Sequence, residues 1–286
     1  MVVEGRSAVR LLPGKSEPIS LGLRERITLL AIRDVFATLE GTPFAEDAQS
    51  IFDKVLATLP DETARDVARL GAGFRYVADG GLKSYAEHAE LVDALLTAAV
   101  HRHVVQAGYR SASGRERAGR LEPWGLALHR NGLYVVGRFE DEPLARVLAV
   151  ERFTSAERVR RARFALPDGF SLDAYFAGAF GVFPGAPSER VVLEFDRDVA
   201  HLVAQRRWHP SQSTTVGGSG AVRVTLDVGV TPDLVTWLVG WGARVRVTEP
   251  ESLADRVHAE HVAAVGLRAR APPGRSRRRR GDPQST

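Results

Sequence analysis

The chain has 286 residues, 44% of them hydrophobic, and it contains no cysteine. This length suggests two or three compact units, and the composition is ordinary for a globular protein. The lack of cysteine excludes disulfide bonds and thiolate chemistry, and it fits a reducing compartment. The first residues lack the apolar stretch of a secretory signal, and no apolar run reaches the length of about 18 residues that a membrane span needs. We therefore expect a soluble cytoplasmic protein that does not enter the membrane.

Basic residues are concentrated in two segments, although the formal net charge is only +4. From Gly266 onward there are seven arginines and one aspartate, and residues 101–165 hold 13 arginines and seven acidic residues. The rest of the chain is acidic. A basic middle segment between acidic flanks favours an anionic partner for that segment. The alternative is a merely solubilising surface, because the chain uses arginine far more than lysine throughout, 36 against three.

The first hundred residues predict a short strand at 8–12 and then helices. Apolar residues recur at helical spacing, and Pro60 ends the second helix. We expect 1–20 to hold the strand and a linker, and 21–101 to be a helical unit. The predicted helices are 21–39, 45–59, part of 61–80, and 86–101.

Over residues 102–165 the apolar period changes to that of short strands separated by tight turns. Five short strands within about 60 residues suggest a small barrel or a strongly bent sheet. The predicted strands are 103–110, 120–129, 133–138, 145–153 and 158–164.

Residues 190–267 alternate strands and helices, which predicts an α+β sandwich, after a linker at 166–189 with a short helix at 171–180. Thr231 is the expected N-cap of one helix, with Pro232 in its first turn and Gly242 at its end. Residues 268–286 have no apolar period, so we expect a disordered arginine-rich tail. The predicted order is strand 190–195, helix 196–207, strand 222–230, helix 231–242, strand 244–250 and helix 250–265.

Signatures of enzymes and metal sites are nearly absent from the sequence. There is no Gly-rich loop after a strand, no G-x-S-x-G and no H-E-x-x-H. His258 and His261 are three apart on a predicted helix, but no third ligand accompanies them, so surface histidines are favoured over a metal site. The glycines of 216–222 predict a hairpin loop and not a phosphate cradle. We expect no catalytic residue, no cofactor and no metal.

The arginines of 133–153 lie inside or beside apolar runs. In a straight strand over 145–153, Arg146 and Arg152 share one face and are about 20 Å apart, so they suit a chain of phosphates better than a single one. Guanidinium groups bind phosphate, and Tyr134 offers a ring on which a base can stack. The alternative is that these arginines form surface ion pairs. The acidic residues available for such pairs are Glu140, Asp141, Glu142 and Glu151.

Three strings in this region match a known pattern. "RLEPWGL" (120–126) supplies an arginine and a Pro-x-Gly-Leu strand, "GLYVVGR" (132–138) a Tyr-x-Val-Gly core, and "ARVLAVERF" (145–153) two arginines. The region therefore resembles the WYL domain of bacterial transcriptional regulators. Tyr109 matches the tyrosine that ends the opening strand of that domain. The departures are Leu133 and Val135 in place of the family's tryptophan and leucine, and Glu151 in place of its aspartate.

The resemblance extends to residues 8–267. "WHPSQ" (208–212) and the string from Trp241 resemble the C-terminal extension of these regulators, and residues 8–100 resemble their last wing strand and helical connector. The winged helix-turn-helix that usually comes first is missing. We expect either that the start codon is misassigned or that the protein lost its own DNA reader.

The resemblance implies an α+β protein whose residues 102–165 form an SH3/Sm-like barrel, flanked by a helical connector and an α/β sandwich. It also implies a ligand sensor, with single-stranded nucleic acid or a nucleotide as effector, and a homodimer. In such a sensor the arginines contact phosphates and the tyrosines stack or shape the pocket. The alternative function is an interaction subunit that modulates a full-length DNA-binding regulator without binding a ligand. The expected effector-binding residues are Tyr109, Arg120, Tyr134, Arg146 and Arg152.

Overall fold

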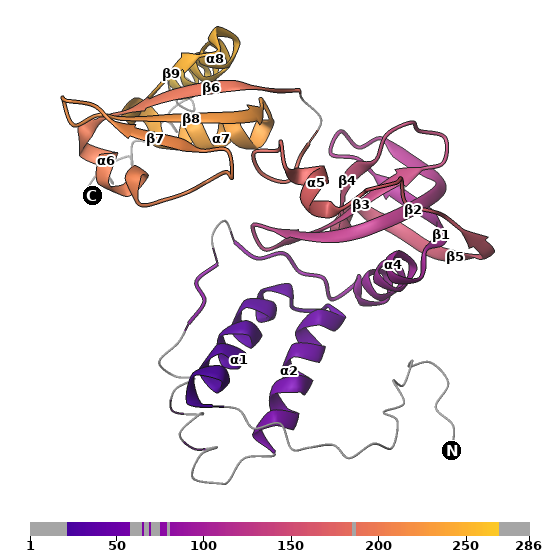
Figure 1. Ribbon diagram of the computed structural model, residues 1–286. Helices are drawn as coiled ribbons and strands as arrows, with labels where there is room; N and C mark the ends of the chain where they lie inside the picture. The colour runs from indigo at the N-terminus through magenta and orange to yellow at the C-terminus, as the bar shows by residue number, and fades with distance from the viewer. Residues whose placement is uncertain are drawn as a thin grey trace, which may run out of the picture. The chain divides into compact units, whose positions relative to one another are not determined.

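The structure is a computed structural model in which the chain divides into two compact units (Figure 1). One unit comprises Met1–Asp93 with Arg130–Gly132, and the other comprises Ala94–His129 with Leu133–Thr286. The predicted strand at 8–12, most of 61–80 and the tail from 269 onward lie outside the described residues. In the described part of the chain, no helix is long and apolar enough to cross a membrane. The described residues are 22–57, 65, 69, 75–78, 81–184 and 187–268.

The first unit contains two helices that pack against each other, α1 (Leu23–Phe36) and α2 (Pro43–Leu56), as the apolar spacing predicts. A short 3-10 helix, η1 (Ala37–Leu39), follows α1. Leu30 and Phe52 form the buried centre of their contact. Helix α2 begins at Pro43, two residues before the predicted start at 45, because proline fits the first turn of a helix, where no N–H partner is needed.

Helix α4 (Ala89–His101) leads into a five-stranded sheet with the order β4-β3-β2-β1-β5. Strand β2 is the longest, and the antiparallel β1–β2 pairing uses its first part. Strand β1 pairs on its other side with β5, also antiparallel. The bounds are β1 (His103–Arg110), β2 (Glu116–His129), β3 (Gly132–Phe139), β4 (Arg146–Ala149) and β5 (Phe153–Arg163).

The α+β class is confirmed, but two details of the prediction for 102–165 are wrong. The sheet is not a closed barrel: all residues from 103 to 163 are described, and the edge strands β4 and β5 do not pair with each other. The expected single strand at 145–153 is also broken. Strand β4 ends at Ala149, the 3-10 turn η2 (Val150–Arg152) follows, and β5 begins at Phe153. The turn lets the chain pass from one edge of the sheet to the other.

A short helix, α5 (Leu172–Phe176), follows the sheet and is shorter than the predicted 171–180. Ser171 caps it by accepting a hydrogen bond from the Ala174 N–H at 3.1 Å. The Tyr175 hydroxyl donates to the carbonyl oxygen of Ala145, just before β4, at 3.1 Å. Burial raises the pKa of Tyr175 above its ordinary value. Helix α5 is thus attached to the β3–β4 hairpin.

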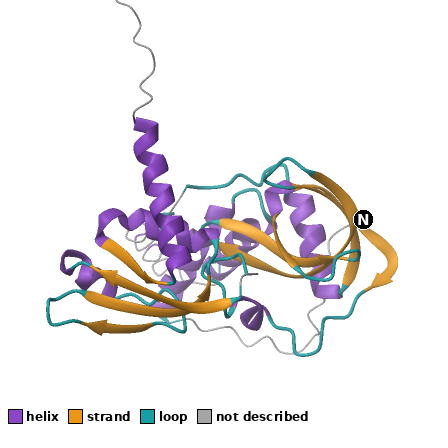
Figure 2. Cartoon of the chain, turned by 90° about the horizontal axis from the view of Figure 1, so that it is seen from above, coloured by secondary structure: helices purple, strands orange, loops and turns teal. Residues whose placement is uncertain are grey.

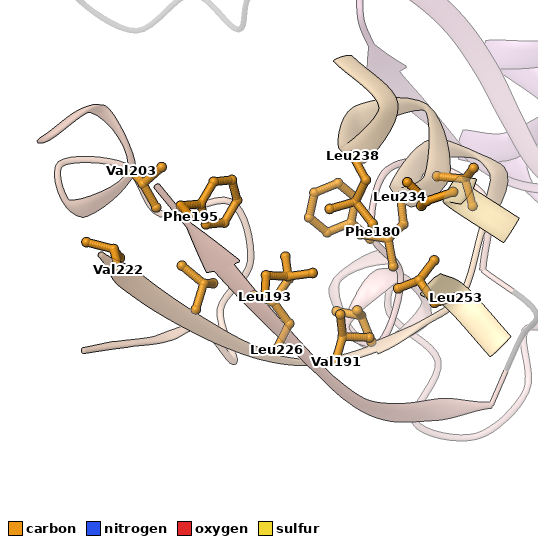
Figure 3. Packing of buried hydrophobic residues seen from close by; sticks show 14 of the residues in the cluster. Phe180, Val191, Leu193, Phe195, Val203, Val222, Leu226, Leu234, Leu238 and Leu253 are labelled. Carbon is orange, nitrogen blue, oxygen red and sulfur yellow. The ribbon is translucent and has the colours of Figure 1, made fainter. Parts of the chain in front are cut away.

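The C-terminal part is a four-stranded antiparallel sheet with the order β7-β8-β6-β9. Side chains from β6, β8, α7 and α8 form one core, in which Leu193 and Leu226 of the strands face Leu234, Leu238 and Leu253 of the helices (Figure 3). The predicted alternation of strands and helices is confirmed, and the glycines of 217–220 form the hairpin loop between β7 and β8. The bounds are β6 (Ser188–Phe195), α6 (Arg197–Ala204), β7 (Ser213–Val216), β8 (Val222–Gly229), α7 (Pro232–Trp241), η3 (Gly242–Arg244), β9 (Val245–Glu249) and α8 (Glu251–Arg268).

Both ends of α7 are formed as predicted. The Thr231 hydroxyl accepts a hydrogen bond from the Leu234 N–H at 3.3 Å and donates to the carbonyl oxygen of Phe180 at 3.0 Å. Gly242 follows the helix with a φ of 58°, in the left-handed region that glycine adopts readily. Helix α8 runs beyond the sheet (Figure 2), and its exposed end carries Val265 and Leu267.

Candidate anion-binding site of the five-stranded sheet

Two of the expected site residues, Tyr109 and Tyr134, meet at Ala149, the last residue of β4. The Tyr109 hydroxyl accepts a hydrogen bond from the Ala149 N–H at 3.2 Å, and its ring lies edge-on to Phe153 with centroids 5.0 Å apart. Tyr134 lies directly opposite Ala149 in the β3–β4 pair. The structure therefore brings together two tyrosines from strands that are distant in sequence.

The ring of Tyr134 is half-buried, and it contacts Phe183 edge-on, with centroids 6.1 Å apart. Arg146 lies opposite Gly137 in the same ladder, three residues from the Tyr134 pair, so Tyr134 and Arg146 point to opposite faces of the β3–β4 ladder. Strand β4 is at the edge of the sheet, so a ligand at this edge could reach both faces.

Arg120 and Arg146 both form ion pairs with acidic residues of the β3–β4 turn. The Nε atom of Arg120 lies 3.2 Å from the Oε1 atom of Glu140, and the Nε atom of Arg146 lies 2.7 Å from the Oε2 atom of Glu142. Both arginine side chains are nevertheless exposed. These contacts are of the kind that the surface ion-pair alternative predicts.

Arg117 strengthens the same cluster, although the sequence patterns did not single it out. Its guanidinium donates hydrogen bonds to Asp141 and Glu142, and its central carbon lies 4.0 Å from the ring centroid of Phe139. Glu142 thus holds Arg117 and Arg146 at once. The three arginines and three carboxylates of this cluster balance one another in charge. The members are Arg117, Arg120, Glu140, Asp141, Glu142 and Arg146.

Arg138 is also paired. Its Nε and Nη2 atoms donate to the same carboxylate oxygen of Glu122, at 3.1 and 2.9 Å, and Glu122 is buried. Glu122 belongs to β2 and Arg138 to β3, so this contact depends on strand register and no local sequence signal could have predicted it.

Arg152 differs from the other expected site arginines. It is exposed in the turn η2, and it forms no ion pair with any residue that the structure describes. The turn places it three residues after Ala149, while Arg146 comes three residues before. The two arginines therefore flank Ala149 along the chain. They do not share the face of a single strand as expected, because η2 interrupts it.

Among the described residues, no three histidine, aspartate or glutamate side chains gather as a metal site would require. The residues at hand can donate hydrogen bonds to an anion and present aromatic rings.

Comparison with protein families identifies two domains. A model described as the WYL domain matches residues 90–158, and a model described as the WCX domain matches residues 187–265. The chain contains a WYL domain followed by a WCX domain. The five-stranded sheet is thus the main part of the WYL domain, and the four-stranded sheet with α6, α7 and α8 belongs to the WCX domain.

Among curated proteins, Protein PafB of Mycobacterium leprae is 27% identical over 214 residues, which cover 74% of this chain and 62% of that protein. Protein PafB of Mycobacterium tuberculosis (strain H37Rv) is 27% identical over 183 residues, or 63% of this chain and 54% of that protein. The matched part of the chain spans less than two thirds of the length of these relatives.

Two solved structures are similar to the chain. One is the proteasome accessory factor B/C (PafBC) of Arthrobacter aurescens, at 23% identity and a TM-score of 0.32, covering 90% of this chain and 36% of that one. The other is a CRISPR Cas-related protein, at 9% identity and a TM-score of 0.44, covering 89% and 88%. Both TM-scores are below 0.5, so the overall similarity of these structures to the chain is low.

Proposed function

We propose that the chain is a WYL-type transcriptional regulatory protein whose WYL domain binds an anionic effector, single-stranded nucleic acid or a nucleotide. The convergence of Tyr109 and Tyr134 at Ala149, flanked by Arg152 and Arg146, is the observation that carries this proposal. Two tyrosines beside Ala149 and two exposed guanidinium groups three residues from it along the chain match the chemistry of a base joined to a phosphate. The presence of WYL and WCX domains and the similarity to PafB support a regulatory role.

Arg152 is the strongest phosphate anchor in this arrangement, because it has no ion pair with a described carboxylate that an effector would have to break. Arg120 and Arg146 must exchange Glu140 and Glu142 for the effector. Ion pairs on an exposed surface contribute only about 0–1 kcal/mol, whereas a phosphate accepts charge-assisted and often bidentate hydrogen bonds from arginine. The exchange is therefore energetically feasible for Arg120 and Arg146, and the acidic turn keeps its contacts with Arg117.

Titration of the full chain with a labelled oligothymidylate tests the proposal. Arg152→Gln should weaken binding and reduce the slope of log K against log salt by roughly 0.7, the value for one phosphate contact on a single strand. Tyr134→Ala should weaken binding by about 1–3 kcal/mol with the slope intact, if its ring stacks on a base.

Arg115→Gln is the matched control, because Arg115 is exposed and forms no ion pair within the described residues. It also corrects for arginines of the tail, which remain in all variants. Equal binding by Arg152→Gln and Arg115→Gln, with equal salt slopes, would refute the effector site.

The second candidate function is an interaction subunit that pairs with a DNA-binding regulator and binds no effector itself. The ion pairs of Arg120 and Arg146 favour it, since they account for these arginines without a ligand. It predicts that none of the substitutions at Arg120, Arg146 or Arg152 changes oligonucleotide binding relative to the control.

A further inference from the structure

The WYL domain carries a second group of arginines that the proposed effector site does not use. Of the 13 arginines in 101–165, five form ion pairs with carboxylates, and eight form none with any carboxylate that the structure describes. Five of those eight lie where β1 begins and β5 ends, and we call this group with His103 the arginine corner. Its members are Arg102, His103, Arg158, Arg160, Arg161 and Arg163.

Strand pairing brings the corner together. Arg163 lies directly opposite His103, and Arg158 lies opposite Val105. The Phe164 N–H donates to the carbonyl oxygen of Arg102 at 3.1 Å, which holds the start of β1 against the end of β5. Between these pairs the register shifts, so that residues 159–162 bulge out of the ladder with Arg160 and Arg161.

Each arginine of the ladder shares a face with the β1 residue that lies opposite it. Arg163 lies on the side of His103, and Arg158 lies on the side of Val105. The nearest acidic residue of β5, Glu157, pairs with Gln106 and lies on the side opposite to Arg158. The corner thus concentrates arginines that form no ion pair with a carboxylate of the described residues.

His103 lies within this charge and is unsatisfied. Only 5% of its surface is exposed, and neither ring nitrogen has a hydrogen-bond partner among the described residues. Burial, and then the charges of Arg158 and Arg163, lower the pKa of His103, so the ring is neutral at pH 7 and carries one N–H. A buried donor without an acceptor costs about 1–3 kcal/mol. An anionic oxygen would supply the missing acceptor.

We propose that the arginine corner binds the phosphodiester backbone of a nucleic acid, at a site separate from the effector site. Five guanidinium groups exceed what one phosphate can neutralise, so a repeating anion fits better than a single one. Arg152 precedes the first residue of β5 and Arg163 is its last, so the two sites lie at opposite ends of a strand up to about 33 Å long. One nucleotide cannot occupy both, and the corner does not rest on the proposed effector function.

The test compares two double variants of the full chain that each remove two positive charges from exposed positions. Arg158→Gln with Arg163→Gln alters the corner, and Arg115→Gln with Arg130→Gln is the control. Binding of a labelled oligothymidylate and of a duplex of the same length is measured by fluorescence anisotropy over a series of salt concentrations. The two arms distinguish a single-stranded from a double-stranded source of the phosphates.

We expect the corner variant to bind about tenfold more weakly than the control at low salt, in at least one arm. On the single strand its salt slope should fall by roughly 1.4, for two phosphate contacts. His103→Phe, which keeps an aromatic ring and removes the N–H, should weaken binding with the slope unchanged, because a neutral imidazole releases no counterion. The melting temperature of each variant is measured to check that it remains folded.

Equal affinity and equal slope of the corner and control variants in both arms would overturn the proposal. The result for the corner is independent of the result for the effector site. Weak binding by the corner variant with unchanged binding by Arg152→Gln would support the corner and refute the effector site. Weak binding by Arg152→Gln with unchanged binding by the corner variant would support the effector site and refute the corner.

Discussion

Glu142 contacts two arginines at once. It accepts from Arg117 and lies 2.7 Å from Arg146, and its own side chain is mostly buried. In the proposed effector complex, a phosphate that took Arg146 would leave Glu142 with Arg117, so the turn would keep one of its contacts. Glu142 would then compete with the effector for Arg146 and also hold the turn through Arg117.

His103 should make the stability of the protein depend on pH. Burial, together with Arg158 and Arg163, lowers its pKa below the ordinary 6.5 in the folded state. The unfolded chain therefore binds the proton more readily, and the free energy of unfolding should decline as the pH falls below about 6.5. In His103→Gln this decline should be less steep. Urea denaturation at about pH 7.5 and about pH 5.5 measures both slopes, and identical slopes would contradict the expectation.

Gly137 is required by a close approach of two strands. A Cβ atom at this position would lie 2.8 Å from the carbonyl oxygen of Glu122 and 3.2 Å from a methyl group of Leu121. Gly137→Ala should lower the free energy of unfolding by about 1–3 kcal/mol, as overpacking does. Gly240→Ala is the matched control, because a Cβ there meets nothing within 4 Å and alanine favours the helix, so stability should rise. A loss of equal size in both variants in thermal denaturation would refute the explanation.

At the residue scale, the sequence predicts what is local and misses what depends on register. Thr231 as a cap and Gly242 as a stop were predictable, because the partners of these residues lie within a few positions along the chain. The ion pairs of Arg117 and Arg138 join β2 to the β3–β4 turn and to β3, and only the pairing of β2 with β3 creates them. For the same reason, the sequence was compatible both with arginines that bind an effector and with arginines that form surface ion pairs, and it did not distinguish the two.

At the scale of elements, the turn η2 is the main departure from expectation. The string "ARVLAVERF" has the run of four apolar residues that a buried strand has, and it contains no glycine or proline to mark a turn. Burial of Val150 within the turn explains how the chain can bend there without such a signal, because the bend keeps an apolar side chain inside. The same bend separates Arg146 from Arg152.

Helix α7 offers a test of capping. Thr231→Ala should cost about 1 kcal/mol, because it removes the acceptor of the Leu234 N–H and the donor to the Phe180 carbonyl oxygen. Thr236→Ala on the exposed side of the same helix removes a similar hydroxyl without these contacts, and should leave stability unchanged or slightly higher. Chemical denaturation compares the two, and an equal loss would show that the cap does not account for the effect.

At the scale of the whole molecule, the apolar surface points to self-association. Trp237 and Trp241 are not part of this surface, since they pack with Phe195 and Trp208 inside the WCX domain. Ile32 and Ile51, however, are 45% and 51% exposed beside an apolar hollow between α1 and α2. We propose a homodimer that uses this hollow.

Light scattering should give twice the chain mass of 31.1 kDa at micromolar concentration. Ile32→Glu with Ile51→Glu should give the monomer mass, since it places charges on the apolar surface. The matched control, Arg24→Glu with Lys54→Glu, changes exposed charged positions of the same helices and should leave the dimer intact. A monomer mass for the unaltered chain would contradict the proposal.

The position of β1 between β2 and β5 has a consequence for synthesis. Strand β1 ends at Arg110 and can pair with β2 as soon as the next turn has formed, but its other edge waits for β5, which begins at Phe153. On the ribosome this edge therefore stays open while the whole of β2, β3 and β4 is made. Strand edges left open in this way are where nascent chains aggregate. Arg102, which directly precedes β1, and the exposed Gln106 on β1 keep that edge polar until the last strand of the WYL domain arrives.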